Sequence, residues 1–446
     1  MNRSKFDLPS QLRAILIRDS PQSSTALQRA TGSSQASISM ALAAMGRDIH
    51  KLGAARSTRY ALTEHIFGLP AQQALCLGGP HPDAGQFGTL TMLHGNRLHV
   101  CGPRRHEWLS DGKLPWWLST LCPQGYLGRR YARLRPDFPV DPDQWTLAQV
   151  LYIATNHVAD PPGAFSIAAV TPALGRELTV AERGDAFDHL ADAATHGFPP
   201  GSSAGGEQPK FVARVGEDHV IVKFSPPRGT PFGERWHDLL QLEHLALEVL
   251  RENGVDTART TVVQTGQRTY LQATRFDRPS ANGKRHVVAA SAIHDAFINT
   301  PRRHWVASAE ALCADGMLDT KHLRSIASSY LFGQYIGNTD MHFGNLSFFV
   351  DDVTHPVFEP TPVYDMLPMM WRPGVHSGEL GTQAMTPQIQ PEGFDAQAAE
   401  VRKWARGYWR QAAELKTLSP GLRAASLENA RMLQSRESGH SVQNTA

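Results

Sequence analysis

The sequence predicts an α+β fold in three successive parts, and three observations indicate it. The N-terminal residues combine short helices carrying apolar stripes with a basic hairpin. Strand-like, aromatic-rich sequence follows. The remainder begins with strands around one long apolar helix and ends in mainly helical sequence. We expect domains at residues 1–65, 85–195 and 196–435, with a Gly- and Pro-rich linker at residues 66–85.

The composition narrows the class of protein. The 446 residues are 41% hydrophobic and 19% charged, which is enough apolar sequence for more than one core. The net charge of +2 is unevenly distributed, because residues 1–65 hold nine Lys/Arg and four acids while the rest is slightly acidic. We therefore expect only the N-terminal part to meet a polyanion. The four scattered cysteines include no CxxC pair, which argues against a thiolate zinc site or a disulfide framework. No apolar run approaches about 18 residues, so a cytoplasmic protein without a membrane partner is expected.

Residues 1–65 have the order of a winged helix-turn-helix. A predicted helix at residues 24–30 is followed by a Thr-Gly-Ser turn, an amphipathic helix at 34–45 and a hairpin at 49–62. The second helix of such a motif enters the major groove of DNA, and the hairpin follows the phosphate backbone. The predicted contacts with double-stranded DNA are Ser34, Gln35, Ser37, Ser39, Lys51, Arg56 and Arg59. The alternative is a winged helix that contacts only proteins.

Residues 200–300 resemble the small lobe of a kinase. The predicted strands lie at 210–215, 219–224, 261–264 and 269–274, and the long helix at 236–253. The small β-rich subdomain before this lobe has strands at 87–93 and 98–100, and helices are expected at 143–156 and 181–194. In the last third we expect a helix at 322–336, strands at 346–350 and 362–364, and further helices from residue 396.

The strongest chemical signal is the segment GNTDMHFGN at residues 337–345, followed by Tyr364-Asp365. Phosphoryl transfer needs a carboxylate at the attacking hydroxyl and oxygen ligands that hold Mg²⁺ against the phosphates. A kinase catalytic loop provides an Asp with an Asn five residues later, and a second Asp after a short hairpin. Asp340, Asn345 and Asp365 have this order and spacing. The alternative is that Asp340 and Asn345 form only local turns.

Two segments of the small lobe complete the candidate site. The loop SSAGGEQPK at residues 202–210 contains adjacent glycines, whose backbone N–H groups can approach phosphate oxygens closely, although such a loop is often only a turn. Lys223 lies in an apolar strand, where a charge needs a partner, and Glu243 on the following helix is the natural one. Alternatively, the Lys223 side chain extends to water.

The strand that leaves the small lobe ends at Thr274, and it is expected to be the hinge whose backbone binds the adenine. Arg275 and Asp277 beyond it could equally form a structural ion pair.

At these residues the chain resembles the HipA family of bacterial toxin kinases. The matching pieces are SSAGGEQPK, IVKF, LEHLALEVL, TRFDRP, IGNTDMHFGNLSFF and PVYDMLP. The resemblance covers residues 85–430, and the fused N-terminal domain is similar to that of a YjjJ-type subgroup. In the family's basic kinase, a separate antitoxin provides the DNA-binding module.

The resemblance implies a two-lobed, protein-kinase-like body with a helical C-terminal lobe, which uses ATP and Mg²⁺. It implies that Asp340 is the catalytic base, that Asn345 and Asp365 are the metal ligands, and that Ser203, or its neighbour Ser202, is autophosphorylated. The implied ATP-binding residues are Ala204, Gly205, Gly206, Glu207, Gln208, Lys210, Lys223, Glu243, Thr274, Phe276, Asp277 and His342. The implied partners are a protein substrate, such as an aminoacyl-tRNA synthetase or another translation factor, and an antitoxin. A homodimer is also expected from the winged helix.

Two departures from the family pattern stand out. Thr274 replaces a glutamate in the hinge, and Ala290-Ser291-Ala292 replaces a Gln-Glu-Asp segment. The intact Asp/Asn/Asp set and Lys223 favour an active serine/threonine protein kinase. The alternatives are a DNA-binding regulator with a pseudokinase sensor body and a small-molecule kinase on the same fold.

Overall fold

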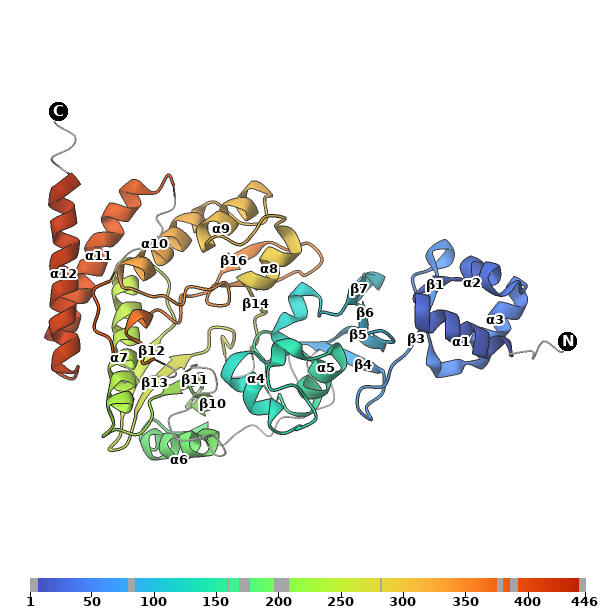
Figure 1. The fold of residues 1–446 in the computed structure, drawn as a ribbon, viewed down its shortest axis with the longest axis horizontal. Coiled ribbons are helices and arrows are strands. Elements are labelled where there is room, and N and C mark those ends of the chain that lie inside the picture. The colour runs from blue at the N-terminus through green and yellow to red at the C-terminus, as the bar shows by residue number, and fades with distance from the viewer. Residues whose placement is uncertain are drawn as a thin grey trace. The chain divides into compact units, whose positions relative to one another are not determined.

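The computed structural model describes residues 7–78, 85–158, 160–167, 177–195, 208–280, 283–374, 380–385 and 392–440. The chain forms two compact units, the first at 1–124 with 128–173 and the second at 125–127 with 174–446. The first unit holds the N-terminal head together with the β-rich segment, and the second holds the body (Figure 1). The domain boundaries at residues 65 and 195 remain predictions. Among the helices of the described ranges, none is long and apolar enough to cross a membrane.

The head consists of three helices and a small antiparallel sheet. The helices are α1 (Leu8–Asp19), α2 (Ser24–Thr31) and α3 (Gln35–Ala44), and the strands are β1 (Gln22–Ser23), β2 (Ile49–Leu52) and β3 (Arg59–Leu62), in the order β1-β3-β2. Gly32 is the C-cap of α2, and its φ of 69° is the left-handed conformation that glycine adopts without steric cost. The apolar stripes of the helices meet in one core, formed by Leu12, Leu16, Leu27, Ile38, Ala41, Leu42 and Leu62.

The β-rich segment is a five-stranded antiparallel sheet. Its strands are β4 (Gln72–Leu77), β5 (Gly85–Leu93), β6 (Arg97–Cys101), β7 (Glu107–Asp111) and β8 (Phe165–Ile167), in the order β7-β6-β5-β4-β8. Helices α4 (Gly125–Ala132) and α5 (Leu147–Asn156) follow the fourth of these strands along the chain. The expected linker at 66–85 is therefore wrong in part, because β4 pairs there with both β5 and β8.

The small lobe of the body is a second five-stranded sheet with two helices. The strands β9 (Glu177–Leu178), β10 (Lys210–Val215), β11 (Asp218–Phe224), β12 (Thr260–Gln264) and β13 (Thr269–Thr274) have the order β12-β13-β11-β10-β9. Helix α6 (Arg183–Thr195) buries Phe187 against Phe211 and Tyr270 of this sheet. Helix α7 (Pro231–Glu252) is the long predicted helix, and it begins at an N-cap where the Thr230 side chain accepts the Gly233 N–H.

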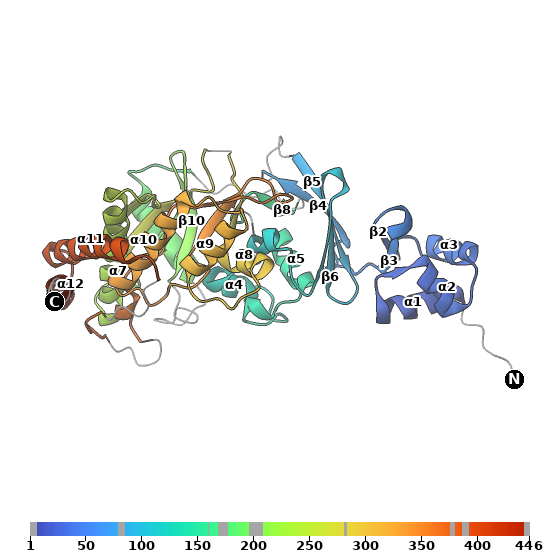
Figure 2. The same cartoon turned by 90° about the horizontal axis from the view of Figure 1, so that it is seen from above.

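The helical lobe packs against α7. It contains a three-stranded sheet of β14 (Val287–Ala289), β15 (Ser347–Val350) and β16 (Phe358–Pro360), and the helices α8 (Ala290–Phe297), α9 (Trp305–Ala314), α10 (Lys321–Tyr335), α11 (Asp395–Glu414) and α12 (Pro420–His440). Buried side chains of α7, α10, α11 and α12 form one core around Trp371, Tyr408 and Trp409, and Figure 2 shows these helices side by side. The predicted strand at 362–364 is wrong. Only Val363 forms a bridge, with Thr257, because Pro362 has no N–H for a ladder.

Candidate active site

Lys223 and Glu243 form a buried ion pair between β11 and α7. The Lys223 Nζ lies 2.6 Å from Oε1 and 2.8 Å from Oε2 of Glu243. Their side chains are 12% and 3% exposed. Burial of either charge alone would be costly, so the pair fixes the position of α7 relative to the sheet. The predicted partnership of Lys223 with Glu243 is present, and the alternative of a lysine that extends to water is excluded.

Asp365 is the second partner of Lys223, with which it also forms an ion pair. Burial works against ionisation of Asp365, but the positive charges of Lys223 and Lys210 outweigh it and lower the pKa of this carboxyl to about 2. Burial likewise opposes the charge on Lys223, and the two carboxylates overcome that effect and raise its pKa. Asp365 has a φ of 53°, in the left-handed region that Asp and Asn tolerate better than most residues. Lys223 and Asp365 are therefore both charged at neutral pH.

Asn338 connects the two segments of the strongest motif. Its Nδ2 donates to the backbone oxygen of Asp365 at 3.2 Å, and its Oδ1 accepts from the backbone N–H of Asp340 at 3.1 Å. Tyr364 supports the same loop, since its hydroxyl donates to the Gly344 backbone oxygen at 2.8 Å. The sequence motifs by themselves assign no role to Asn338 or Tyr364. The position of each residue inside one of the two motifs is the signal that points to them.

Asp340 and Asn345 lie on the loop that follows α10. The Asn345 Nδ2 donates to the backbone oxygen of Asp340 at 2.8 Å, which leaves the Oδ1 oxygen as the atom that can bind a cation. The Asp340 side chain is 46% exposed, and its carboxylate lies 4.0 Å from the Nε2 of His342. A pocket of about 270 Å³ adjoins this carboxylate, lined by Tyr330, Gln334, Gly337, Asn338, Thr339, Asp340, Met341 and His342. Asp340 therefore faces a space that could admit an acceptor hydroxyl.

Of the predicted hinge residues, Thr274 makes a backbone hydrogen bond and Phe276 packs against two aromatic rings. Thr274 ends β13, and its backbone N–H donates to the Arg259 oxygen at 2.9 Å. The ring of Phe276 lies between those of Phe349 and Tyr364, with centroid distances of 5.9 and 5.8 Å. These contacts place Phe276 beside the Asp365 segment.

Asp277 is buried between two arginines. Its carboxylate accepts from Arg275 at 3.0 and 2.9 Å and from Arg278 at 2.9 Å. This arrangement favours the structural ion pair over a contact with ATP.

The Gly-rich loop lies mostly outside the described residues. The predicted site residues that lie outside the described ranges are Ser202, Ser203, Ala204, Gly205, Gly206 and Glu207. Gln208, which follows it, donates from Nε2 to the Phe224 backbone oxygen at 2.6 Å. Lys210 pairs in register with Lys223 across β10 and β11, so the end of this loop begins beside the ion-pair cluster.

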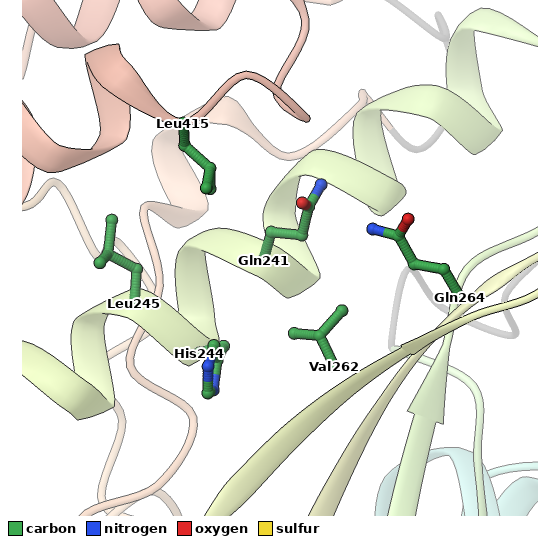
Figure 3. A pocket seen from close by; sticks show the side chains of 6 residues that line it. All are labelled: Gln241, His244, Leu245, Val262, Gln264 and Leu415. Atoms are coloured by element: carbon green, nitrogen blue, oxygen red, sulfur yellow. The ribbon is translucent and has the colours of Figure 1, made fainter.

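A second pocket, of about 470 Å³, is lined by α7, β12 and the residue that follows α11. Figure 3 shows Gln241, His244 and Leu245 of α7 facing Val262 and Gln264 of β12, with Leu415 above them. None of the residues predicted for the site lines this pocket.

In the head, two of the predicted DNA contacts have a structural task. The Ser34 Oγ accepts the Ser37 N–H at 3.2 Å as the N-cap of α3, and the two hydroxyls lie 2.9 Å apart. Gln35 and Ser39 are exposed one turn apart on the same face of α3. Lys51 on β2, Arg56 in the β2–β3 turn and Arg59 on β3 are all exposed.

Comparisons with known proteins agree with the motifs. Residues 202–426 match the HipA-like C-terminal domain, and residues 75–173 match the middle domain of YjjJ-like toxins. Toxin YjjJ of Escherichia coli (strain K12) is 34% identical over 381 residues, which are 82% of this chain and 84% of that protein. A putative kinase of Haemophilus influenzae is 26% identical over 203 residues, which are 40% of this chain and 56% of that protein.

A solved structure supports the fold. The matching chain comes from the Shewanella oneidensis MR-1 complex of HipA, HipB and operator DNA, with a TM-score of 0.53 at 17% identity over 82% of this chain and 96% of that one. At this identity the likeness shows the kinase-like fold alone. The family resemblance predicted from the motifs is confirmed by the sequence comparisons, and the chain belongs to the HipA family, among its YjjJ-like toxins.

Proposed function

We propose that this protein is an ATP-dependent serine/threonine protein kinase. The observation that carries the proposal is the contact of Lys223 with both Glu243 and Asp365, the latter linked to the Asp340–Asn345 loop through Asn338. A lysine paired with a helix carboxylate and placed beside a metal-binding aspartate is the arrangement that protein kinases use to hold nucleotide phosphates.

The residues present suit Mg²⁺ brought in by a nucleotide. Within the described ranges, no group of three or more His, Cys, Asp and Glu side chains is arranged to hold a metal ion. The Asn345 Oδ1 and the Asp365 carboxylate are hard oxygen ligands, which Mg²⁺ prefers together with substrate phosphates. Bound there, the ion would neutralise charge on the phosphates. Asp340 would accept the proton of the attacking hydroxyl, and Lys223 would orient the phosphates.

The finer assignments rest on the family resemblance. We infer autophosphorylation at Ser203 or Ser202, and contacts of the loop at 204–210 with the phosphates. A translation-related protein, such as an aminoacyl-tRNA synthetase, is the proposed substrate, and an antitoxin is a proposed partner. The pocket of about 270 Å³ beside Asp340 has room for the hydroxyl group of an acceptor next to this carboxylate.

We also propose that the head is a winged helix-turn-helix that binds double-stranded DNA. Three helices, a tight turn at Gly32 and a three-stranded sheet support this proposal. The exposed Gln35 and Ser39 would reach base edges, and Lys51, Arg56 and Arg59 would bind phosphates.

The kinase proposal is tested by incubating the wild type and Asp340→Ala with labelled ATP and Mg²⁺, followed by mass spectrometry of the peptide at 195–215. We expect label on Ser203 or Ser202 in the wild type alone. No label in either protein, with the serines shown beforehand to be unmodified, would favour a pseudokinase regulator. Turnover of small metabolites while proteins stay unlabelled would favour a small-molecule kinase.

A further inference from the structure

The hairpin loop between β6 and β7, at residues 102–106, presents two adjacent arginines outside the predicted DNA-binding residues. Arg104 and Arg105 are both exposed. Neither has an acidic partner among the residues that the structure describes, whereas Arg97 at the other end of the same hairpin is paired with Asp111 at 3.4 Å. Unpaired guanidinium groups on a short loop form a site for an anionic partner.

The loop holds these arginines in a fixed shape. The Gly102 N–H donates to the His106 backbone oxygen at 2.8 Å, and the His106 ring lies 4.4 Å from that of Trp108. A side chain on Gly102 would approach the Trp108 ring to 2.8 Å, so the base of the loop is closely packed.

Both arginines have positive φ angles, 52° for Arg104 and 61° for Arg105. Glycine or asparagine would adopt this backbone more easily. The turn itself therefore does not explain two arginines, which points to a role for their side chains.

The loop lies next to the wing of the head, which is the hairpin of β2 and β3. The Gly53 N–H, at the start of the β2–β3 turn, donates to the two carboxylate oxygens of Glu107 at 3.2 and 2.9 Å. Glu107 directly follows the loop in the chain. The backbone of the wing and the base of the arginine loop are thus joined within the first compact unit.

Two further contacts hold the head against the same sheet. The His50 Nε2 and His99 Nδ1 lie 2.9 Å apart, and Leu52 and Ala61 pack against Leu93. The wing and the loop are therefore presented together rather than by a free linker.

The combined surface is positively charged. Lys51, Arg56 and Arg59 of the wing are exposed, and within the described ranges none of them forms an ion pair. The nearby carboxylate of Glu107 already accepts from the Gly53 N–H and lies 3.3 Å from His99. Charges that are not neutralised locally attract a polyanion.

We propose that Arg104 and Arg105 bind the phosphate backbone of double-stranded DNA beside the segment bound by the wing, so that the head and the β-rich segment share one DNA footprint. This inference rests on the proposed DNA binding of the head. Phosphate contacts of this kind add affinity and set the register of the protein on the duplex without reading bases.

The test is fluorescence anisotropy of the full-length protein with a labelled duplex of arbitrary sequence, about three helical turns long, at several salt concentrations. Arg104→Asn with Arg105→Asn removes both guanidinium groups and keeps residues that tolerate the left-handed backbone. Lys403→Asn with Arg431→Asn makes the same change of charge on exposed positions of α11 and α12. Lys51→Asn with Arg56→Asn tests the wing, and a double-stranded RNA of equal length is a second probe.

For the loop variant we expect roughly tenfold weaker DNA binding at low salt, and a slope of log affinity against log salt that is smaller by about 0.9 for each phosphate that is no longer neutralised. The α11–α12 variant should bind as the wild type does. The inference would be overturned if the loop variant and the α11–α12 variant lost DNA affinity equally, or if the loop variant bound DNA as tightly as the wild type. It would also be overturned if the loop variant lost affinity for the RNA probe but not for the DNA duplex. If the wild type itself does not bind the duplex, the proposed DNA binding fails. If only the wing variant binds DNA more weakly, the proposed DNA binding of the head survives, and the proposed phosphate contacts of Arg104 and Arg105 are wrong.

Discussion

Lys223 on β11 binds the carboxylate of Asp365, which lies 142 positions later in the chain, while its Nζ also contacts Glu243 on α7. One ammonium group thus joins the sheet of the small lobe, the long helix and the segment after the Asp340–Asn345 loop. The relationship matters for function because it places the proposed phosphate-binding lysine and a proposed metal ligand in contact before any nucleotide binds.

Removing Lys223 is expected to destabilise the fold as well as abolish phosphoryl transfer. Lys223→Met would leave the Glu243 carboxylate buried without its partner, and breaking a buried pair on one side costs about 3–5 kcal/mol. Urea unfolding at pH 7 measures this loss. The double variant Lys223→Met with Glu243→Gln should recover a large part of the stability but none of the activity. If Lys223→Met alone were as stable as the wild type, the buried ion pair of Lys223 with Glu243 would not stabilise the fold.

The contribution of Asp365 to stability should depend on pH in the acidic range. Its pKa is lowered to about 2 in the folded protein from an ordinary value of 3.8. A lowered pKa gives stability that is present above the unfolded value and is lost as the pH falls toward the folded one. The difference in unfolding free energy between the wild type and Asp365→Asn should therefore be constant above about pH 5 and shrink below about pH 4.

Asparagine tolerates the left-handed backbone at this position, so Asp365→Asn isolates the charge. The matched control is Asp351→Asn, at a carboxylate that is 79% exposed. If both variants show the same dependence on pH across the acidic range, the buried pairing of Asp365 is not its cause.

Asp340→Asn should separate chemistry from folding. The backbone N–H and oxygen of Asp340 hold the loop through Asn338 and Asn345, and these bonds survive the substitution. The half-exposed carboxylate contributes little to stability, so the unfolding midpoint should stay unchanged. A general base contributes about 10²–10⁴-fold to rate, and phosphoryl transfer should fall by that factor. Calorimetric titration with MgATP should show retained binding. Full activity in this variant would rule out Asp340 as the base.

Much of this architecture follows from local sequence. The predicted strands at 210–215 and 219–224 correspond to β10 and β11 because alternating apolar residues on either side of a Gly-Glu-Asp turn favour a hairpin. Asp340 and Asn345 share one loop, so their spacing alone indicates that they lie close together. The Lys223–Glu243 pair is predictable for a different reason, since a charge in an apolar strand requires a partner.

Other features depend on contacts that spacing does not encode. The pairing of Lys223 with Asp365 arises from the packing of two lobes, and the hydrogen bond from Asn338 to Asp365 links residues 27 positions apart. The strand β4 falls inside the predicted linker because Gly and Pro residues follow it in the sequence. Its stability comes from pairing with β5 and β8 on either side, which is tertiary context that overrides local propensity.

The N-terminus of α3 allows the structural task of the head to be separated from its proposed DNA binding. Ser34 caps the helix by accepting the Ser37 N–H, so Ser34→Ala should cost about 1 kcal/mol of stability. Gln35 is exposed and makes no such contact in the cap, so Gln35→Ala should leave stability unchanged and weaken discrimination among DNA sequences.

Ser34→Asp is the matched control, because aspartate restores the cap while its charge repels phosphate. Its unfolding midpoint should equal that of the wild type while its DNA affinity falls. A variant Ser34→Ala with unchanged thermal stability would show that the cap is dispensable, and DNA binding unaffected by Ser34→Asp would place this end of α3 away from the duplex.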